Sequence, residues 1–154
     1  MPTVFEVARY FLSKSVPNTP WAITHLKLQK LAYYAQGWYL AFTGNVLFNE
    51  RLEAWVHGPV SPDLFHKYRR FGHNEIPQED FPDSRSIFTK KQLEVLDAVW
   101  EAYGEYSGKF LEELTHQELP WLEARSNLDS NDYSNEVILV DTIRSYFRNQ
   151  LGDE

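Results

Sequence analysis

Histidines and acidic residues are the side chains of this sequence that could carry acid–base or metal chemistry. The chain has five histidines and no cysteine, which excludes thiolate nucleophiles, disulfides and cysteine zinc sites. No two histidines lie four residues apart, and the HExxH pattern of zinc proteases is absent. His57, His66 and His73 could meet only if the helix after Pro59 folded back on the preceding strands. The spacing therefore predicts surface or capping histidines and no metal site.

A catalytic interpretation would need a nucleophile, a base and a group that orients the base. His57 near Glu53 and His116 near Glu113 could form acid–base pairs, but such pairs arise by chance in any charged chain. The GxSxG motif of serine hydrolases is absent. We therefore expect a protein that is not an enzyme and that binds no cofactor.

Basic side chains gather on two predicted helices. The helix that begins at Ser61 carries Lys67, Arg69 and Arg70 close together. Lys27 and Lys30 lie on the second, again with aromatic residues nearby. Such a patch could contact nucleic acid or an acidic segment of a partner protein, although a solvated helix face would have the same composition.

The acidic residues are concentrated in the last third of the chain. Residues 105–154 contain eleven acidic and four basic residues, whereas residues 1–104 contain eleven of each, so the net charge of −7 belongs to the last third. A negative field repels nucleic acid and steers basic partners. Nucleic acid is therefore an unfavourable partner, and the acidic third could steer a basic protein or serve only as a solubilising face.

The segment WVHGPV, residues 55–60, is the best candidate for a binding surface. Two short strands, 46–48 and 51–56, are predicted around a turn at Asn49-Glu50, and Gly58-Pro59 should end the hairpin. Trp55 should lie on the open face of this hairpin. A tryptophan there is costly to expose, so either a partner protein or another helix should cover it.

About six helices should pack around this hairpin as a mainly α, compact, single-domain fold. Cap patterns place the helix starts, and glycines at 44, 72 and 104 end three of the helices. Residues 72–86 and 127–135 should be loops, and Leu119-Pro120-Trp121 should terminate a helix. The predicted starts are Thr3, Thr24, Ser61, Thr89, Ser107 and Glu136.

The helix from Thr24 to Gly44 should be the central one, with leucines and alanines on its apolar stripe. Lys27, Lys30, Tyr34 and Gln36 are predicted to point away from that stripe. Gly37 inside this helix costs about 1 kcal/mol relative to alanine, which close packing against the hairpin would justify.

The N-terminal segment lacks the apolar region of a signal peptide, and no apolar run approaches the roughly 20 residues of a membrane span. The sequence therefore predicts one cytoplasmic domain over residues 1–154.

Four segments of the sequence form a familiar set: LQKLAYYAQGWYLAFTG followed by RLEAWVHGPV, then SPDLFHKYRRFG, and later THQELPW. They resemble the motifs of the Panacea domain family, also described as SocA-like antitoxins and phage-associated GepA-like proteins. The resemblance covers most of the chain from about Val4 to Arg125. The resemblance implies a bacterial or prophage antitoxin that neutralises the toxin encoded by a neighbouring gene through direct binding.

The resemblance also leaves alternatives open. A member could act as a proteolytic adaptor that delivers its toxin to a ClpXP-type protease, or as a nucleic-acid-binding phage-associated regulator. Neither the toxin nor the oligomeric state follows from the sequence. No catalytic, cofactor or metal residue is expected, and the predicted partner-binding residues are Tyr34, Trp38, Trp55, His57, Gly58, Pro59, Lys67 and Arg70.

Overall fold

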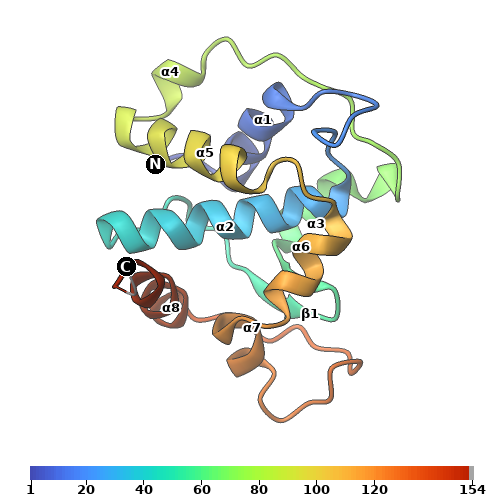
Figure 1. Cartoon of the computed structure of the whole chain (residues 1–154), viewed down its shortest axis with the longest axis vertical. Helices are drawn as coiled ribbons and strands as arrows, with labels where there is room; N and C mark the ends of the chain where they lie inside the picture. Colours follow the sequence, from blue (N-terminus) through green and yellow to red (C-terminus); the bar gives the residue numbers. More distant parts are fainter. Residues whose placement is uncertain (153–154) are drawn as a thin grey trace.

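A computed structural model describes residues 1–152 as a mainly α-helical fold with one small hairpin (Figure 1). This confirms the fold class, and two short helices, α4 and α7, add to the six that were expected. The elements are α1 (Val4–Lys14), α2 (His25–Thr43), β1 (Glu53–Trp55), β2 (Gly58–Val60), α3 (Pro62–Tyr68), the 3₁₀ helix η1 (Arg69–Phe71), α4 (Ser84–Ile87), α5 (Lys90–Tyr103), α6 (Gly108–Thr115), α7 (Leu119–Ala124) and α8 (Val140–Gly152).

Helix α2 lies at the centre of the fold. In Figure 1, α1, α4 and α5 lie on one side of it, and α7, α8 and the hairpin lie on the other. Fourteen of its 19 residues are buried, and Phe42 near its C-terminal end is its one exposed residue. The prediction that Lys27, Lys30, Tyr34 and Gln36 point outward is therefore wrong, because neighbouring elements enclose the helix on its polar side as well.

Local cap signals placed the helix starts well. Thr3 with Glu6 and Thr89 with Gln92 form complete capping boxes at α1 and α5. In each box the threonine side chain and the third helical residue satisfy backbone N–H groups that would otherwise lack acceptors. The other predicted caps, each accepting from the third helical N–H, are Thr24, Ser61 and Ser107.

Gly37 brings α8 close to α2. A Cβ atom at Gly37 would lie 2.5 Å from Cδ2 and 2.7 Å from Cζ of the Phe147 ring on α8. The close packing expected for this glycine is present, but its neighbour is α8 and not the hairpin. The reason is that Phe147, at 1% exposure, fills the space directly over the glycine.

The hairpin forms farther along the chain than predicted. β1 and β2 are antiparallel, with Glu53 opposite Val60, Ala54 opposite Pro59 and Trp55 opposite Gly58. The turn is thus at Val56–His57, and Gly58-Pro59 begins the second strand instead of ending the hairpin. Pro59 lies opposite Ala54 on this short strand, where its missing N–H is tolerated.

Residues 46–48, predicted as the first strand, are irregular. The Gln36 side chain donates to the Phe48 carbonyl (2.8 Å) and accepts from the Leu47 N–H (2.6 Å). A neighbouring strand would have used these backbone groups. Because the Gln36 side chain binds them, the segment is held against α2 and forms no strand.

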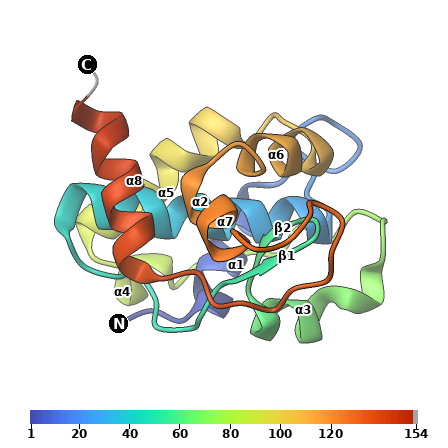
Figure 2. The same ribbon diagram turned by 90° about the horizontal axis from the view of Figure 1, so that it is seen from below.

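An extended segment before α8 adds to the outer edge of β1. Val137 forms an isolated antiparallel bridge with Glu53, and Figure 2 shows the chain running beside the hairpin toward α8. The last helix therefore begins at Val140 and not at Glu136 as predicted, because residues 136–138 bind β1 first.

Pro120 does not terminate a helix, contrary to the prediction. It lies in the first turn of α7, where a missing backbone N–H costs nothing. Within residues 1–152, no helix is long and apolar enough to cross a membrane.

Candidate functional site

Long polar side chains of α2 hold the irregular backbone around the helix. The Lys27 ammonium donates to the carbonyls of Pro20 (2.9 Å), Ala22 (3.0 Å) and Gly104. Burial lowers the pKa of Lys27 to about 8. Three carbonyl acceptors compensate for much of the lost hydration. This lysine therefore has a structural role, holding three backbone segments together, and is not part of a basic surface.

Two glutamines of α2 work in the same way. The Gln29 amide accepts from the Ser61 N–H (2.8 Å) and donates to the Ser61 carbonyl (3.1 Å). This pair of hydrogen bonds holds Ser61, the N-cap of α3, in place. Gln36 holds the segment after α2 in the same way. Neither amide is available to a partner, since both are buried.

Lys30 lies beneath the hairpin. Its ammonium donates to the Pro59 carbonyl at 3.0 Å, and its side chain is fully buried. A Cβ at Gly58 would approach the Lys30 Cε at 2.8 Å and the Thr115 hydroxyl at 2.7 Å, and Gly58 has a φ of 102°. Glycine is therefore required there both by its backbone conformation and by the space that Lys30 occupies. Burial lowers the pKa of Lys30 to about 7, although the charge of Glu112 acts in the opposite direction.

A groove of about 870 Å³ opens beside the hairpin turn. Its walls come from α2, the hairpin, α3 with η1, α6 and the loop before the extended segment. We refer to it as the hairpin groove. Its side chains include Trp55, Val56, His57, Phe65, Arg69, His73, Lys109, Glu112, Tyr133 and Ser134.

Trp55 is the main aromatic residue of the hairpin groove. Its ring meets the Phe65 ring edge to face, with centroids 4.9 Å apart. Its indole N–H donates to Glu53 at 2.8 Å, and its carbonyl accepts from the Trp121 indole at 2.7 Å. Trp55 is half-buried, so the α3 helix covers part of the ring, and the remainder faces the groove with its orientation already fixed.

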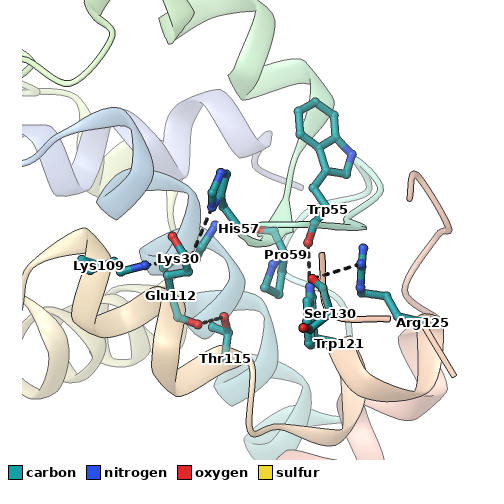
Figure 3. A network of polar contacts seen from close by, with 10 residues as sticks. All are labelled: Lys30, Trp55, His57, Pro59, Lys109, Glu112, Thr115, Trp121, Arg125 and Ser130. Carbon is teal, nitrogen blue, oxygen red and sulfur yellow. Dashed lines mark hydrogen bonds and ion pairs between the residues drawn. The ribbon is translucent and has the colours of Figure 1, made fainter. Parts of the chain in front are cut away.

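Glu112 on α6 forms the polar wall of the groove (Figure 3). Its carboxylate accepts from His57 Nδ1 at 3.3 Å and from Lys109 Nζ at 3.4 Å. Burial raises the pKa of Glu112, but the hydrogen bond and charge of His57, together with Lys109, bring it below its usual value. His57 and Lys109 are themselves mostly exposed, so both side chains are accessible at the rim.

Helix α7 supports the hairpin from the other side. The Trp121 ring stacks on His116, with centroids 4.1 Å apart. Arg125 is buried and donates from Nη1 to the Ala54 carbonyl at 3.0 Å. Its Nη2 also binds the carbonyls of Asp129 and Asp132, so one guanidinium connects β1 to the following loop.

Two predicted partner-binding residues lie in the core between α2 and its neighbours. Tyr34 is fully buried, stacks on Tyr103 at 4.1 Å and donates its hydroxyl to Glu118 at 2.9 Å. Trp38 is half-buried and donates to the Tyr103 hydroxyl at 2.9 Å. Neither lines the hairpin groove, and Tyr34 has no surface to offer a partner.

The remaining predicted residues separate into two groups. Trp55 and His57 line the hairpin groove, while Gly58 and Pro59 are buried in the strand behind it. Lys67 and Arg70 are exposed on α3 and η1 but are not among the residues of the groove. The structure thus brings two of the eight predicted side chains together at this site.

The sequence reasoning missed most of the groove's other side chains. No local motif marked Phe65, Lys109 or Glu112 as residues of a site. Tyr133 lies in a segment that was predicted only as a polar loop, yet it is 79% exposed. An exposed tyrosine in a polar loop was the one signal that could have indicated a contact surface there.

Part of the chain matches a known protein family. Residues 28–122 match the family model "Antitoxin SocA-like, Panacea domain". The matched region runs from α2 into α7. It contains Gln29, Lys30 and Gln36 of α2, the hairpin and Glu112, whereas Lys27 lies just before it.

One curated relative is Antitoxin SocA of Caulobacter vibrioides, strain NA1000 / CB15N. It is 46% identical to this chain over 52 residues, which are 34% of this chain and 26% of the relative. The matched segment thus spans about a quarter of the relative's length. No solved structure matches the chain. Because the family model covers more than half of the sequence, the chain belongs to the family of SocA-like antitoxins that share the Panacea domain.

Proposed function

We propose that this chain is an antitoxin that neutralises a toxin protein by direct binding, with the hairpin groove as the contact surface. Family membership supports the antitoxin role. The observation that carries the choice of surface is the preformed groove with the half-buried Trp55 in its wall.

The groove has the properties of an anchor site. Hot spots in protein interfaces are enriched in tryptophan that enters well-packed, desolvated surroundings. Trp55 is held by Phe65, by its N–H bond to Glu53 and by the Trp121 bond to its carbonyl. A side chain fixed in this way loses little further conformational entropy when a partner binds.

Charge at the groove is divided between its two walls. His57, Lys109 and Arg69 place basic groups on one part of the rim. Asp129 and Asp132 are exposed on the loop that leads to the opposite wall. We infer that the acidic loop steers a basic toxin toward the groove, and that this affects association rate and register more than affinity.

A nucleic-acid-binding role receives less support. Lys27 and Lys30, two of the five basic residues that suggested it, are buried and bind backbone carbonyls. The basic side chains that remain on α3 and η1 form a small group within an acidic protein.

The test is a neutralisation assay with the neighbouring reading frame of the native locus. That gene is induced alone and together with this chain, and colony formation is scored in hosts with and without a ClpXP-type protease. Rescue in both hosts is the expected result. Rescue only with the protease would favour the adaptor mechanism, and a neighbour that is harmless alone would contradict the toxin assignment.

The Trp55→Ala variant tests the groove itself. We expect it to weaken toxin binding at least tenfold, as loss of a buried aromatic anchor does. Trp21→Ala is a matched control because Trp21 is also half-buried but packs on Trp100, away from the groove. Affinity is measured by calorimetry, and circular dichroism verifies the fold. Unchanged affinity in a folded Trp55→Ala protein would refute the anchor.

A further inference from the structure

The extended segment at residues 135–139 pairs with the outer edge of β1 through one isolated antiparallel bridge beside the two-stranded sheet. Ala54 donates its N–H to the Glu136 carbonyl, and Ile138 donates its N–H to the Leu52 carbonyl, both at 2.8 Å. Val137 lies between these two bonds, opposite Glu53. The segment therefore covers β1, and its own outer side is the edge of the sheet.

The backbone of Val137 faces away from β1. In an antiparallel ladder, alternate residues direct both N–H and C=O to the same side. Because Glu136 and Ile138 bind inward, the N–H and C=O of Val137 point outward. Neither has a backbone or side-chain partner among the described residues.

Apolar side chains accompany this open edge. Val137 is 47% exposed and Leu139 is 62% exposed. Beside them, a hollow of about 330 Å³ lies between the loop at 46–52 and residues 137–143. An added strand would thus gain both hydrogen bonds and a place for alternate side chains, which are the two sources of affinity and specificity in strand addition.

The charge around the edge selects the kind of strand that fits. Residues 126–143 include Asp129, Asp132, Glu136 and Asp141 and no lysine or arginine. All four acids are exposed. An incoming strand with basic residues would complement them, whereas an acidic one would be repelled.

The same charges disfavour a second copy of this chain. Two such edges paired antiparallel about Val137 would bring the acidic residues of both copies to one short interface. Charged residues are a usual means of preventing edge-to-edge self-association. The edge is therefore open to a partner but protected against its own copy.

The edge also continues from the hairpin groove. Tyr133 and Ser134, which precede it directly, are groove residues. We propose that residues 135–139 accept an extended, basic segment of the partner protein as an additional β-strand, which runs on from the groove. The identity of that partner as the toxin rests on the proposed function.

Val137→Pro tests the edge selectively. Proline removes the outward N–H of Val137 while the Glu136 and Ile138 bonds to β1 remain, so the fold is preserved. Val137→Ala is the matched control, because it shortens the side chain but keeps the N–H. Thermal unfolding of both variants, expected close to that of the parent chain, establishes that they are folded.

The probe is a short, blocked peptide of alternating lysine and valine, followed by NMR of the ¹⁵N-labelled chain. We expect shifts concentrated at residues 135–139 and slower hydrogen exchange of the Val137 amide. Val137→Pro should weaken this binding at least tenfold and Val137→Ala much less. A glutamate–valine peptide should bind at least tenfold more weakly than the lysine–valine peptide.

Shifts elsewhere, or equal binding by the Val137→Pro variant, would overturn the inference. So would concentration-dependent dimerisation through the same amides in sedimentation experiments, because the occupant would then be a second copy. Toxin binding separates the two proposals. If Trp55→Ala abolishes toxin binding and Val137→Pro does not, the groove remains the proposed contact surface and the edge proposal is refuted. If the parent chain does not bind the toxin at all, the proposed function is refuted, and the peptide experiment alone decides whether the edge accepts a strand.

Discussion

Replacing Gly37 by alanine tests whether α2 and α8 are held together by the contact between this glycine and Phe147. In an exposed helix the substitution would stabilise the protein by about 1 kcal/mol, because alanine has the better helix propensity. Here the new methyl group would lie 2.5–2.7 Å from two carbons of the Phe147 ring. Carbon atoms normally approach to about 3.5–4.0 Å, so the ring or the helix must move by about 1 Å.

The ring has little free space into which it can move. It lies among Tyr33, Tyr34, Trp38 and Tyr146, with centroid separations between 5.0 and 6.1 Å. Overpacking of this kind costs about 1–3 kcal/mol, and expelling the ring costs a similar amount in lost burial. After the propensity gain of about 1 kcal/mol is subtracted, we expect a net loss of up to about 2 kcal/mol.

A double-mutant cycle makes the argument specific. Phe147→Ala alone should cost about 3–5 kcal/mol, and in that background Gly37→Ala should become neutral or stabilising, since the obstacle is gone. Phe147→Leu serves as a second background if the alanine variant does not fold. Urea unfolding followed by circular dichroism gives each free energy.

Gly152→Ala is the control, because nothing lies within 4 Å of the position where its Cβ would be. We expect a change within about 0.5 kcal/mol there. Equal destabilisation by Gly37→Ala with and without Phe147 would refute the reasoning. So would a stabilised Gly37→Ala single variant.

Two buried titratable groups give opposite dependences of stability on pH. Burial raises the pKa of Glu118 from 4.5 to about 7, so the folded state holds its proton longer; the resulting stability is full below pH 4.5 and is lost as the pH rises through 7, by up to about 3 kcal/mol. Urea unfolding at several pH values gives the free energy of unfolding of the parent chain and of Glu118→Gln. This free energy should fall between pH 4.5 and pH 7 in the parent chain but not in the variant, and the same pH dependence in both would contradict the assignment. Burial lowers the pKa of Lys30 from 10.5 to about 7, so its contribution to stability is full above pH 10.5 and is lost as the pH falls to 7, by up to about 5 kcal/mol. In Lys30→Met the increase in the free energy of unfolding between pH 7 and pH 10.5 should disappear. If the increase persists in this variant, another group causes it.

Much of the fold was predictable because the signals are local. The threonine and serine caps act within one helical turn, and Pro62 directly after Ser61 fixes the start of α3. The errors occurred where a distant segment takes over local backbone groups. Gln36 binds the chain at Leu47 and Phe48 and prevents a strand there, and β1 captures residues 136–138 before α8 can begin. No window of neighbouring residues contains that information.

The site was less predictable than the fold. Trp55 and His57 were predicted because an aromatic residue beside a glycine–proline corner is a local pattern. Both line the hairpin groove, and their role in binding stays a prediction. Tyr34 was misassigned because periodicity places it off the apolar stripe of α2, whereas Tyr103 and Glu118 enclose it from elements about 70 and 85 residues away. Glu112 and Tyr133 reach the groove only through the packing of α6 and the last loop.

The division between matched and unmatched sequence has a consequence for partner choice. Residues 28–122 contain the hydrogen bonds that Gln29, Lys30 and Gln36 make from α2. They also contain the glycine next to Lys30 and the Trp121 bond to the hairpin. The polar groups in these interactions have their hydrogen-bond partners within the protein. They therefore shape the groove but do not select a particular partner. Tyr133 and the open edge at Val137 lie outside that region, and they are exposed. Because only exposed groups can discriminate among partners, exchanging residues 123–139 between two members of this family should alter partner choice more than exchanging the α2 motif, which should instead change stability.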